Sequence, residues 1–96
     1  PAWAQAQALA GCGAWIKLSG WYRLAAAEPY TALLPHLRRA LAMFGPRCVW
    51  GSDWPHTSFG PDRLPCYDST LAPVASVLDT AGLDALLREQ ARTLYL

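Results

Sequence analysis

The sequence predicts an α/β fold with a parallel sheet. Two short hydrophobic runs, residues 14–19 and 47–51, have the length and bulky side chains typical of strands. A stripe of apolar residues at helical spacing separates them, from about residue 29 to residue 44. Strand, helix and strand in this order are typical of a βαβ unit, whose two strands run in the same direction.

The chain before the middle helix predicts a helix and then a strand. Residues 3–10 are rich in alanine and favour a helix that stops at Gly11. In the strand that follows, Trp15 and Lys17 share one face. Lysine is almost never fully buried unless it is paired. We therefore expect Lys17 to face a polar barrel interior and to meet an acidic partner, either in this chain or outside it.

The middle helix carries the apolar stripe Tyr30, Leu33, Leu34, Leu37, Leu41 and Phe44. Pro35 would remove a hydrogen bond from a helix interior, so regular helix should start near Ala32 or later and hold Pro35 in its first turn. Gly45 and Pro46 should end it. His36 lies near the start of this helix, and we expect a surface or packing residue there.

After the second strand, residues 52–65 form a loop rich in proline, glycine and serine. Apolar residues then predict a helix over residues 71–78, an interruption at Gly82 and a last helix over residues 83–95. Two strands cannot complete a parallel sheet, which needs both faces covered. We therefore expect residues 1–96 to be one incomplete domain, with no second domain, that does not fold cooperatively alone.

The composition supports an incomplete domain and excludes some functions. Five tryptophans are many for 96 residues, and we expect Trp3, Trp15 and Trp50 to pack on neighbours outside the chain. A net charge of +1 argues against a nucleic-acid partner. No run of ~18 apolar residues predicts a membrane span. Three cysteines without a C-x-x-C pair are typical of reduced thiols, and we expect a cytoplasmic protein.

The residues that carry chemistry follow the two predicted strands. Asp53 comes directly after the second strand and precedes Trp54 and His56. An aspartate there can act as a general base or bind a metal, and it can equally be a turn residue. Arg23 follows the first strand, where it can hold a substrate carboxylate or lie on the surface. His56 can be a ligand, a proton carrier or a packing residue.

The motifs W-I-K-L-S-G-x-Y-R and R-C-V-W-G-S-D-W-P-H-T resemble the amidohydrolase-related family, nearest to its pyrone-dicarboxylate lactonase branch. The resemblance implies a (β/α)₈ TIM barrel, of which this chain would supply the C-terminal part, about strands seven and eight with their flanking helices. Gln90 and Ala91 replace the Asn-Pro that is usual in the family's last helix.

The resemblance also implies a hydrolase that opens a lactone or similar ester of a small carboxylated molecule. Asp53 would activate water, Arg23 would hold the substrate carboxylate, and Trp54 and His56 would shape the pocket mouth. Some branches use a divalent metal such as zinc, for which Asp53 would be a ligand, and others use none. Two alternatives stay open: a decarboxylase of the same superfamily, and a catalytically inactive truncated fragment.

Overall fold

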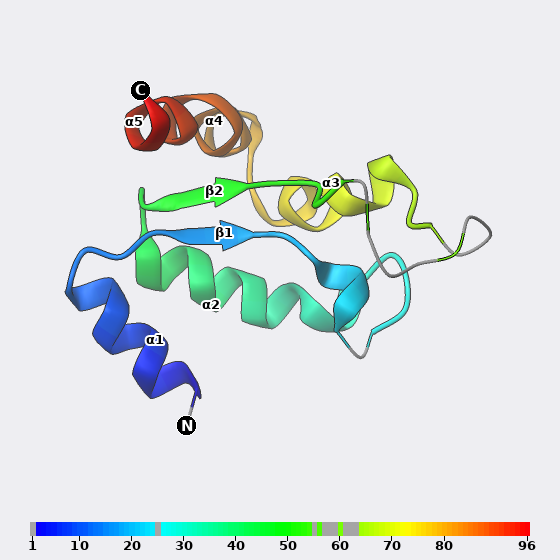
Figure 1. Cartoon of the computed structure of the whole chain (residues 1–96), viewed down its shortest axis with the longest axis horizontal. Helices are drawn as coiled ribbons and strands as arrows, with labels where there is room; N and C mark the ends of the chain where they lie inside the picture. Colours follow the sequence, from blue (N-terminus) through cyan, green and yellow to red (C-terminus); the bar gives the residue numbers. More distant parts are fainter. Residues whose placement is uncertain (1, 25, 55, 57–59, 61–63) are drawn as a thin grey trace.

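The structure, a computed structural model, describes residues 2–24, 26–54, 56, 60 and 64–96. A helix, a strand, a helix, a second strand and a group of helices follow one another along the chain (Figure 1). The main elements are α1 (Ala2–Gly11), β1 (Ile16–Leu18), α2 (Leu34–Phe44), β2 (Cys48–Trp50), α3 (Tyr67–Val77), α4 (Thr80–Asp84) and α5 (Gln90–Tyr95).

The two strands pair in parallel, which confirms the predicted βαβ unit. The register sets β1 (Ile16–Leu18) opposite β2 (Cys48–Trp50). Each strand has three residues, fewer than the predicted strands over residues 14–19 and 47–51. Two further hydrogen bonds extend the pairing beyond the three paired positions. The N–H of Ile16 donates to the carbonyl oxygen of Arg47 at 3.0 Å, and the N–H of Gly51 donates to the carbonyl oxygen of Leu18 at 3.3 Å.

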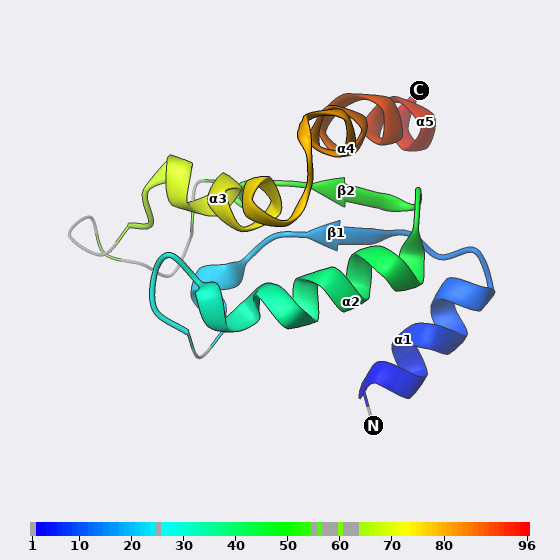
Figure 2. The ribbon, with the colours of Figure 1, turned by 180° about the vertical axis from the view of Figure 1, so that it is seen from behind.

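Helix α2 connects the strands and begins as the proline predicts. Pro35 is its second residue, within the first turn, where a missing N–H leaves no helical bond unmade. A 3₁₀ turn, η2 (Thr31–Leu33), precedes it. Leu37 and Phe44 of the apolar stripe are buried, and Gly45 ends the helix with a φ of 57°. Figures 1 and 2 show α2 running along the strand pair from one end to the other.

Trp3 of α1 packs on α2, which corrects the expectation that it needs a neighbour from outside the chain. Its ring stacks on the His36 ring, with centroids 6.1 Å apart and an interplanar angle of 15°. The guanidinium carbon of Arg39 lies 4.5 Å from the Trp3 ring centroid, within the range of a cation–π contact. His36 is therefore a packing residue on an exposed surface, as predicted.

Trp50 also finds its neighbours within the chain. Its indole Nε1 donates a hydrogen bond of 2.9 Å to the carbonyl oxygen of Thr70 in α3. Its ring meets the edge of Tyr67, with centroids 6.0 Å apart. Trp21, which is 5% exposed, donates to the same Thr70 oxygen at 2.6 Å. This carbonyl therefore joins α3 to the ends of both strands, whereas Trp15 stays half-buried.

The C-terminal helices differ from the prediction in two places. Helix α3 begins at Tyr67, four residues before the predicted start at Leu71. Gly82 does not interrupt a helix; it lies inside α4, and the break falls before it. The reason is the side chain of Asp79, whose Oδ1 accepts a 2.7 Å hydrogen bond from the Gly82 N–H and caps the new helix. A π-helical turn, η4 (Ala85–Glu89), joins α4 to α5.

The core lies between the strand pair and its helices. Cys48 of β2, Val74 of α3 and Leu86 of η4 are at most 1% exposed and belong to one hydrophobic cluster. Burial raises the pKa of the Cys48 thiol to about 11, so it stays protonated and packs as a small apolar side chain. None of the helices in the described residues has the length and apolar character needed to cross a membrane.

Replacing Leu86 with alanine should destabilise the protein by about 2–5 kcal/mol, because the change opens a cavity in a closed core. The measurement is the urea unfolding midpoint of the full-length protein. Leu87→Ala is the matched control, since the neighbouring leucine in η4 is 39% exposed. Its effect should stay within ~0.5 kcal/mol. Equal losses for the two variants would contradict this position of the core.

Candidate functional site

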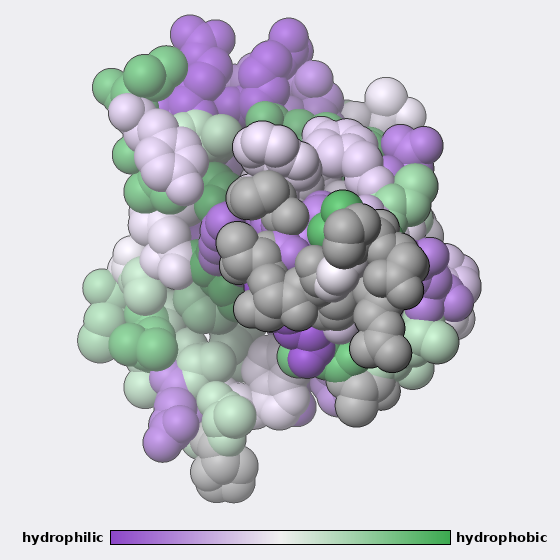
Figure 3. Space-filling view, turned by 45° about the vertical axis from the view of Figure 1, so that its right-hand side comes forward, coloured by the Kyte–Doolittle hydropathy of each residue, from purple (hydrophilic) through white to green (hydrophobic). Residues whose placement is uncertain are grey.

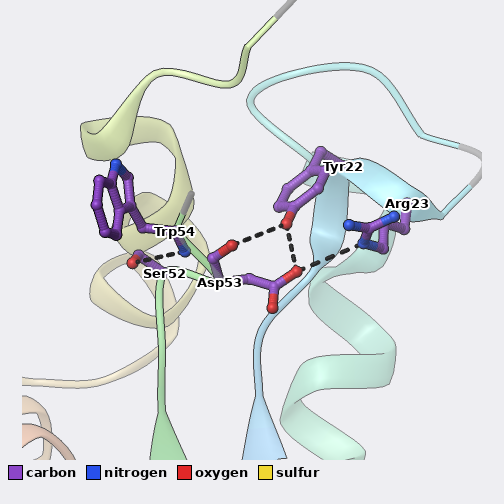
Figure 4. A network of polar contacts seen from close by, with 5 residues as sticks. All are labelled: Tyr22, Arg23, Ser52, Asp53 and Trp54. Carbon is purple, nitrogen blue, oxygen red and sulfur yellow. Dashed lines mark hydrogen bonds and ion pairs between the residues drawn. The ribbon is translucent and has the colours of Figure 1, made fainter. Parts of the chain in front are cut away.

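The carboxyl ends of the two strands bring the predicted site residues together. Gly20, with a φ of 73°, turns the chain after β1 into a 3₁₀ turn, η1 (Trp21–Arg23). After β2 the chain turns at Asp53, whose φ is 63°. Because parallel strands end at the same edge of a sheet, both turns lie side by side. Figure 4 shows the side chains of Tyr22 and Arg23 reaching toward Asp53 from the neighbouring strand.

Two groups of η1 contact the Asp53 carboxylate on the same oxygen. The Tyr22 hydroxyl donates a hydrogen bond to Oδ2, and it also lies 3.5 Å from the Asp53 carbonyl oxygen. Arg23 Nε lies 3.4 Å from Oδ2 in an ion pair whose side chains are 42% and 36% exposed. The structure thus joins Arg23 and Asp53, which the sequence placed at one sheet edge, and it adds Tyr22.

Tyr22 is the residue that the sequence analysis missed as a site residue. Its only signal was its place in the S-G-x-Y-R motif, directly before Arg23. Whether a tyrosine hydroxyl at this place reaches a carboxylate depends on the turn at Gly20, which the period of the strand does not specify.

The charges around Asp53 favour its ionised form. The hydrogen bond from Tyr22 is the main cause of the lowered pKa of Asp53. Burial, the next largest cause, opposes it, and the contact with Arg23 and the charge of Lys17 lower the pKa further. Burial and the Asp53 carboxylate raise the pKa of Tyr22. At neutral pH the pair is therefore a carboxylate and a protonated phenol that donates to it.

Lys17 acts on an acid within the chain, Asp53. The lysine side chain is exposed and lies over Gly51, where an added Cβ would be 2.5 Å from Lys17 Cε. Glycine at position 51 leaves room for the lysine stem. The ammonium group is close enough to lower the pKa of Asp53.

His56 and Trp54 lie in different surroundings. His56 is 4% exposed, and its ring meets the Tyr22 ring edge-on, with centroids 5.0 Å apart and an angle of 88°. Its backbone N–H donates to the Asp53 carbonyl oxygen at 3.0 Å. Trp54 is 77% exposed, and Figure 4 shows its indole directed away from Tyr22 and Arg23. The other residues of the motif, Pro55 and Thr57, lie outside the described residues.

The described residues do not fit a divalent metal. Among them, no three histidine, cysteine, aspartate or glutamate side chains come close enough to hold an ion. The nearest side chains to Asp53 supply a guanidinium and a phenol that occupy Oδ2, and the cations would repel a metal ion. No chemical step is therefore routed through a metal here.

Two cavities lie beside helix α2, away from the Asp53 carboxylate. One cavity of about 530 Å³ lies between α1 and α2, and an apolar one of about 190 Å³ lies between Trp21 and α2. Asp53 lines neither of them. Figure 3 brings the loop end of the molecule forward, and its coloured surface mixes hydrophilic and hydrophobic side chains.

Three comparisons place the chain among known proteins. A family model described as amidohydrolase matches residues 1–96. Two proteins named 4-sulfomuconolactone hydrolase are similar to about half of the chain: one from Rhizobium radiobacter is 44% identical over 54 residues, and one from Hydrogenophaga intermedia is 36% identical over 53 residues. Each match covers 53% of this chain and 18% of the relative.

A solved structure resembles nearly the whole chain. It is that of a candidate 2-pyrone-4,6-dicarboxylic acid hydrolase from Pseudomonas putida, with a TM-score of 0.71 and 33% sequence identity. The match covers 95% of this chain and 34% of the Pseudomonas chain. The chain thus spans about a third of this neighbour, and the matched segment about a fifth of each curated relative.

The Asp53 carboxyl should titrate below the ordinary value of 3.8 in the folded protein, because a phenol and two cations stabilise its charge. A carbon NMR titration of labelled aspartate measures this pKa. Adding salt to ~1 M should move it part of the way back, since salt screens exposed charges but not the Tyr22 hydrogen bond.

The same shift has a consequence for stability. Because the folded-state pKa of Asp53 is depressed, its contribution is present above the unfolded-state pKa and is lost as the pH falls through the folded-state pKa. A carboxyl that titrates at or above its ordinary value would contradict the contacts described for Asp53.

Proposed function

Because the chain belongs to the amidohydrolase family, we propose that the protein is a hydrolase that opens the ring of a small carboxylated lactone. The observation that carries this proposal is an ionised Asp53 beside Arg23 at the carboxyl ends of two parallel strands. The similar proteins support it, because their names describe hydrolysis of a muconolactone and of a pyrone dicarboxylic acid.

Family membership and the likeness to the Pseudomonas chain imply a TIM barrel. We place β1 and β2 as strands seven and eight of that barrel, so that residues 1–96 form its C-terminal part. The parallel pairing and the connecting helix α2 support this placement. Active sites of TIM barrels lie at the carboxyl ends of the strands, which is the edge where Asp53 and Arg23 meet.

In this proposal Asp53 is the general base. It takes a proton from a water molecule, and the water oxygen bonds to the lactone carbonyl carbon. The ring C–O bond then breaks, and the departing oxygen takes up a proton, so that the product is an open-chain hydroxy or keto acid. The low pKa of Asp53 keeps it ionised and ready to accept the proton at neutral pH.

Arg23 is the substrate-binding residue of the proposal. Its contact with Asp53 engages Nε, one of the five N–H donors of a guanidinium. A guanidinium group can bind a carboxylate in paired, parallel hydrogen bonds. Exposure of the Arg23 side chain at 42% supports access by a substrate.

We assign Trp54 and His56 different parts in the same site. Trp54, which is exposed beside Asp53, supplies a flat apolar surface at the mouth on which an unsaturated ring can stack. His56 is buried against Tyr22 and supports the wall behind the carboxylate.

Asp53→Asn should lower kcat by about 10²–10⁴-fold in the full-length protein, since an amide cannot accept the proton from water. Steady-state hydrolysis of a carboxylated pyrone or muconolactone measures this. Asp84→Asn is the matched control, because Asp84 forms an ion pair with Arg88 at 3.0 Å away from the site. Near-normal turnover by Asp53→Asn would exclude this aspartate as the base.

Arg23→Met should raise KM for a carboxylated lactone by about ten- to a hundredfold, the effect of losing hydrogen bonds to a charged group. The KM for an uncharged lactone of the same ring size should stay nearly constant. Arg88→Met provides the control for loss of an exposed arginine. The same KM change for both substrates would rule out recognition of the carboxylate by Arg23.

A further inference from the structure

Tyr22 contacts three residues of the candidate site, Asp53, His56 and Arg23. Its hydroxyl contacts the carboxylate and the carbonyl oxygen of Asp53. Its ring packs against His56 on one side, and the guanidinium carbon of Arg23 lies 5.3 Å from the ring centroid. Any movement of this tyrosine would therefore disturb the side chains that the proposed function places around the substrate.

The two carboxylate oxygens of Asp53 differ in their contacts with η1. Oδ2 receives both the Tyr22 hydroxyl and Arg23 Nε. Among the described residues, Oδ1 has no hydrogen-bond partner, and Figure 4 shows it directed away from both donors. Because no hydrogen-bond donor among the described residues occupies Oδ1, this oxygen can accept a proton from water.

The position of Tyr22 is itself fixed. The edge-on contact with the buried His56 ring restrains the phenol ring. Two contacts with Asp53, one to the side chain and one to the backbone, restrain its hydroxyl. Because the pKa of Tyr22 is raised, the hydroxyl keeps its proton and stays a donor at neutral pH, where Asp53 is ionised.

We propose that Tyr22 is a positioning residue, which holds Asp53 through Oδ2 so that Oδ1 faces the reacting water. This inference rests on the proposed function for the part that concerns catalysis, whereas the contact itself exists without a substrate. Arg23 shares Oδ2 but is also required by the substrate carboxylate. Tyr22 is neutral, does not bind the anionic group and can hold Asp53 throughout the reaction.

Tyr22→Phe tests the proposal, because it removes the hydroxyl and keeps the ring that contacts His56 and Arg23. In the full-length protein, kcat should fall about ten- to a hundredfold with less than about twofold change in KM, as expected for loss of a hydrogen bond to a charged group. The pKa of Asp53 should rise, so the acid limb of the kcat profile should move to higher pH.

Tyr30→Phe is the matched control. Tyr30 is 3% exposed and its hydroxyl lies 3.5 Å from the Glu28 carboxylate, so the same substitution removes a similar contact elsewhere. It should leave kcat and the acid limb unchanged. A second variant carries 3-fluorotyrosine at position 22. This more acidic phenol is a stronger donor and should lower the Asp53 pKa further.

A carbon NMR titration of Asp53 without substrate separates the two proposals. If the wild type hydrolyses no lactone, the proposed function fails, and the titration still reports on the contact with Tyr22. If the wild type is active, an unchanged Asp53 pKa and unchanged kcat in Tyr22→Phe would overturn the positioning role. Equal losses in Tyr22→Phe and Tyr30→Phe would also overturn it, since they would indicate a general structural effect.

Discussion

The parallel pairing of β1 with β2 is the constraint on which the site depends. Because the strands are neighbours and run in the same direction, the residues after Leu18 and after Trp50 leave the sheet at one edge. A left-handed backbone turn follows each strand, at Gly20 and at Asp53. These turns bring together side chains that are 30 positions apart in the sequence. The carbonyl oxygen of Thr70, which accepts from both Trp21 and Trp50, ties α3 to the same edge.

The chemistry at this edge follows from the balance of charge around one carboxylate. Asp53 is surrounded by a neutral donor, Tyr22, and two cations, Arg23 and Lys17. This arrangement suits a permanently ionised base and an anionic substrate, because the excess positive charge attracts carboxylates. Arg23 and Lys17 thus add to the effect of the Tyr22 hydrogen bond, which is the main cause of the low Asp53 pKa.

The sequence was sufficient to predict features that periodicity and chain direction determine. The βαβ unit, Pro35 in the first turn of α2 and the meeting of Arg23 with Asp53 are of this kind. The sequence was insufficient where a local contact or turn determines the structure. Helix α3 begins at Tyr67, before the apolar residues from which the helix was predicted. The cap by Asp79 places Gly82 inside a helix. The contact of Tyr22 with Asp53 depends on the turn at Gly20.

In the proposed reaction Arg23 contacts two carboxylates, that of Asp53 and that of the substrate. If the guanidinium alone kept Asp53 ionised, substrate binding would withdraw that support and raise the pKa of the base at the moment of reaction. The main cause of the low Asp53 pKa is instead the hydrogen bond from Tyr22, which an anionic substrate does not compete for. The exposed Arg23 contact at 3.4 Å is the weaker one. In the proposed reaction, the Tyr22 hydrogen bond therefore limits the rise in the Asp53 pKa when an anion binds to Arg23.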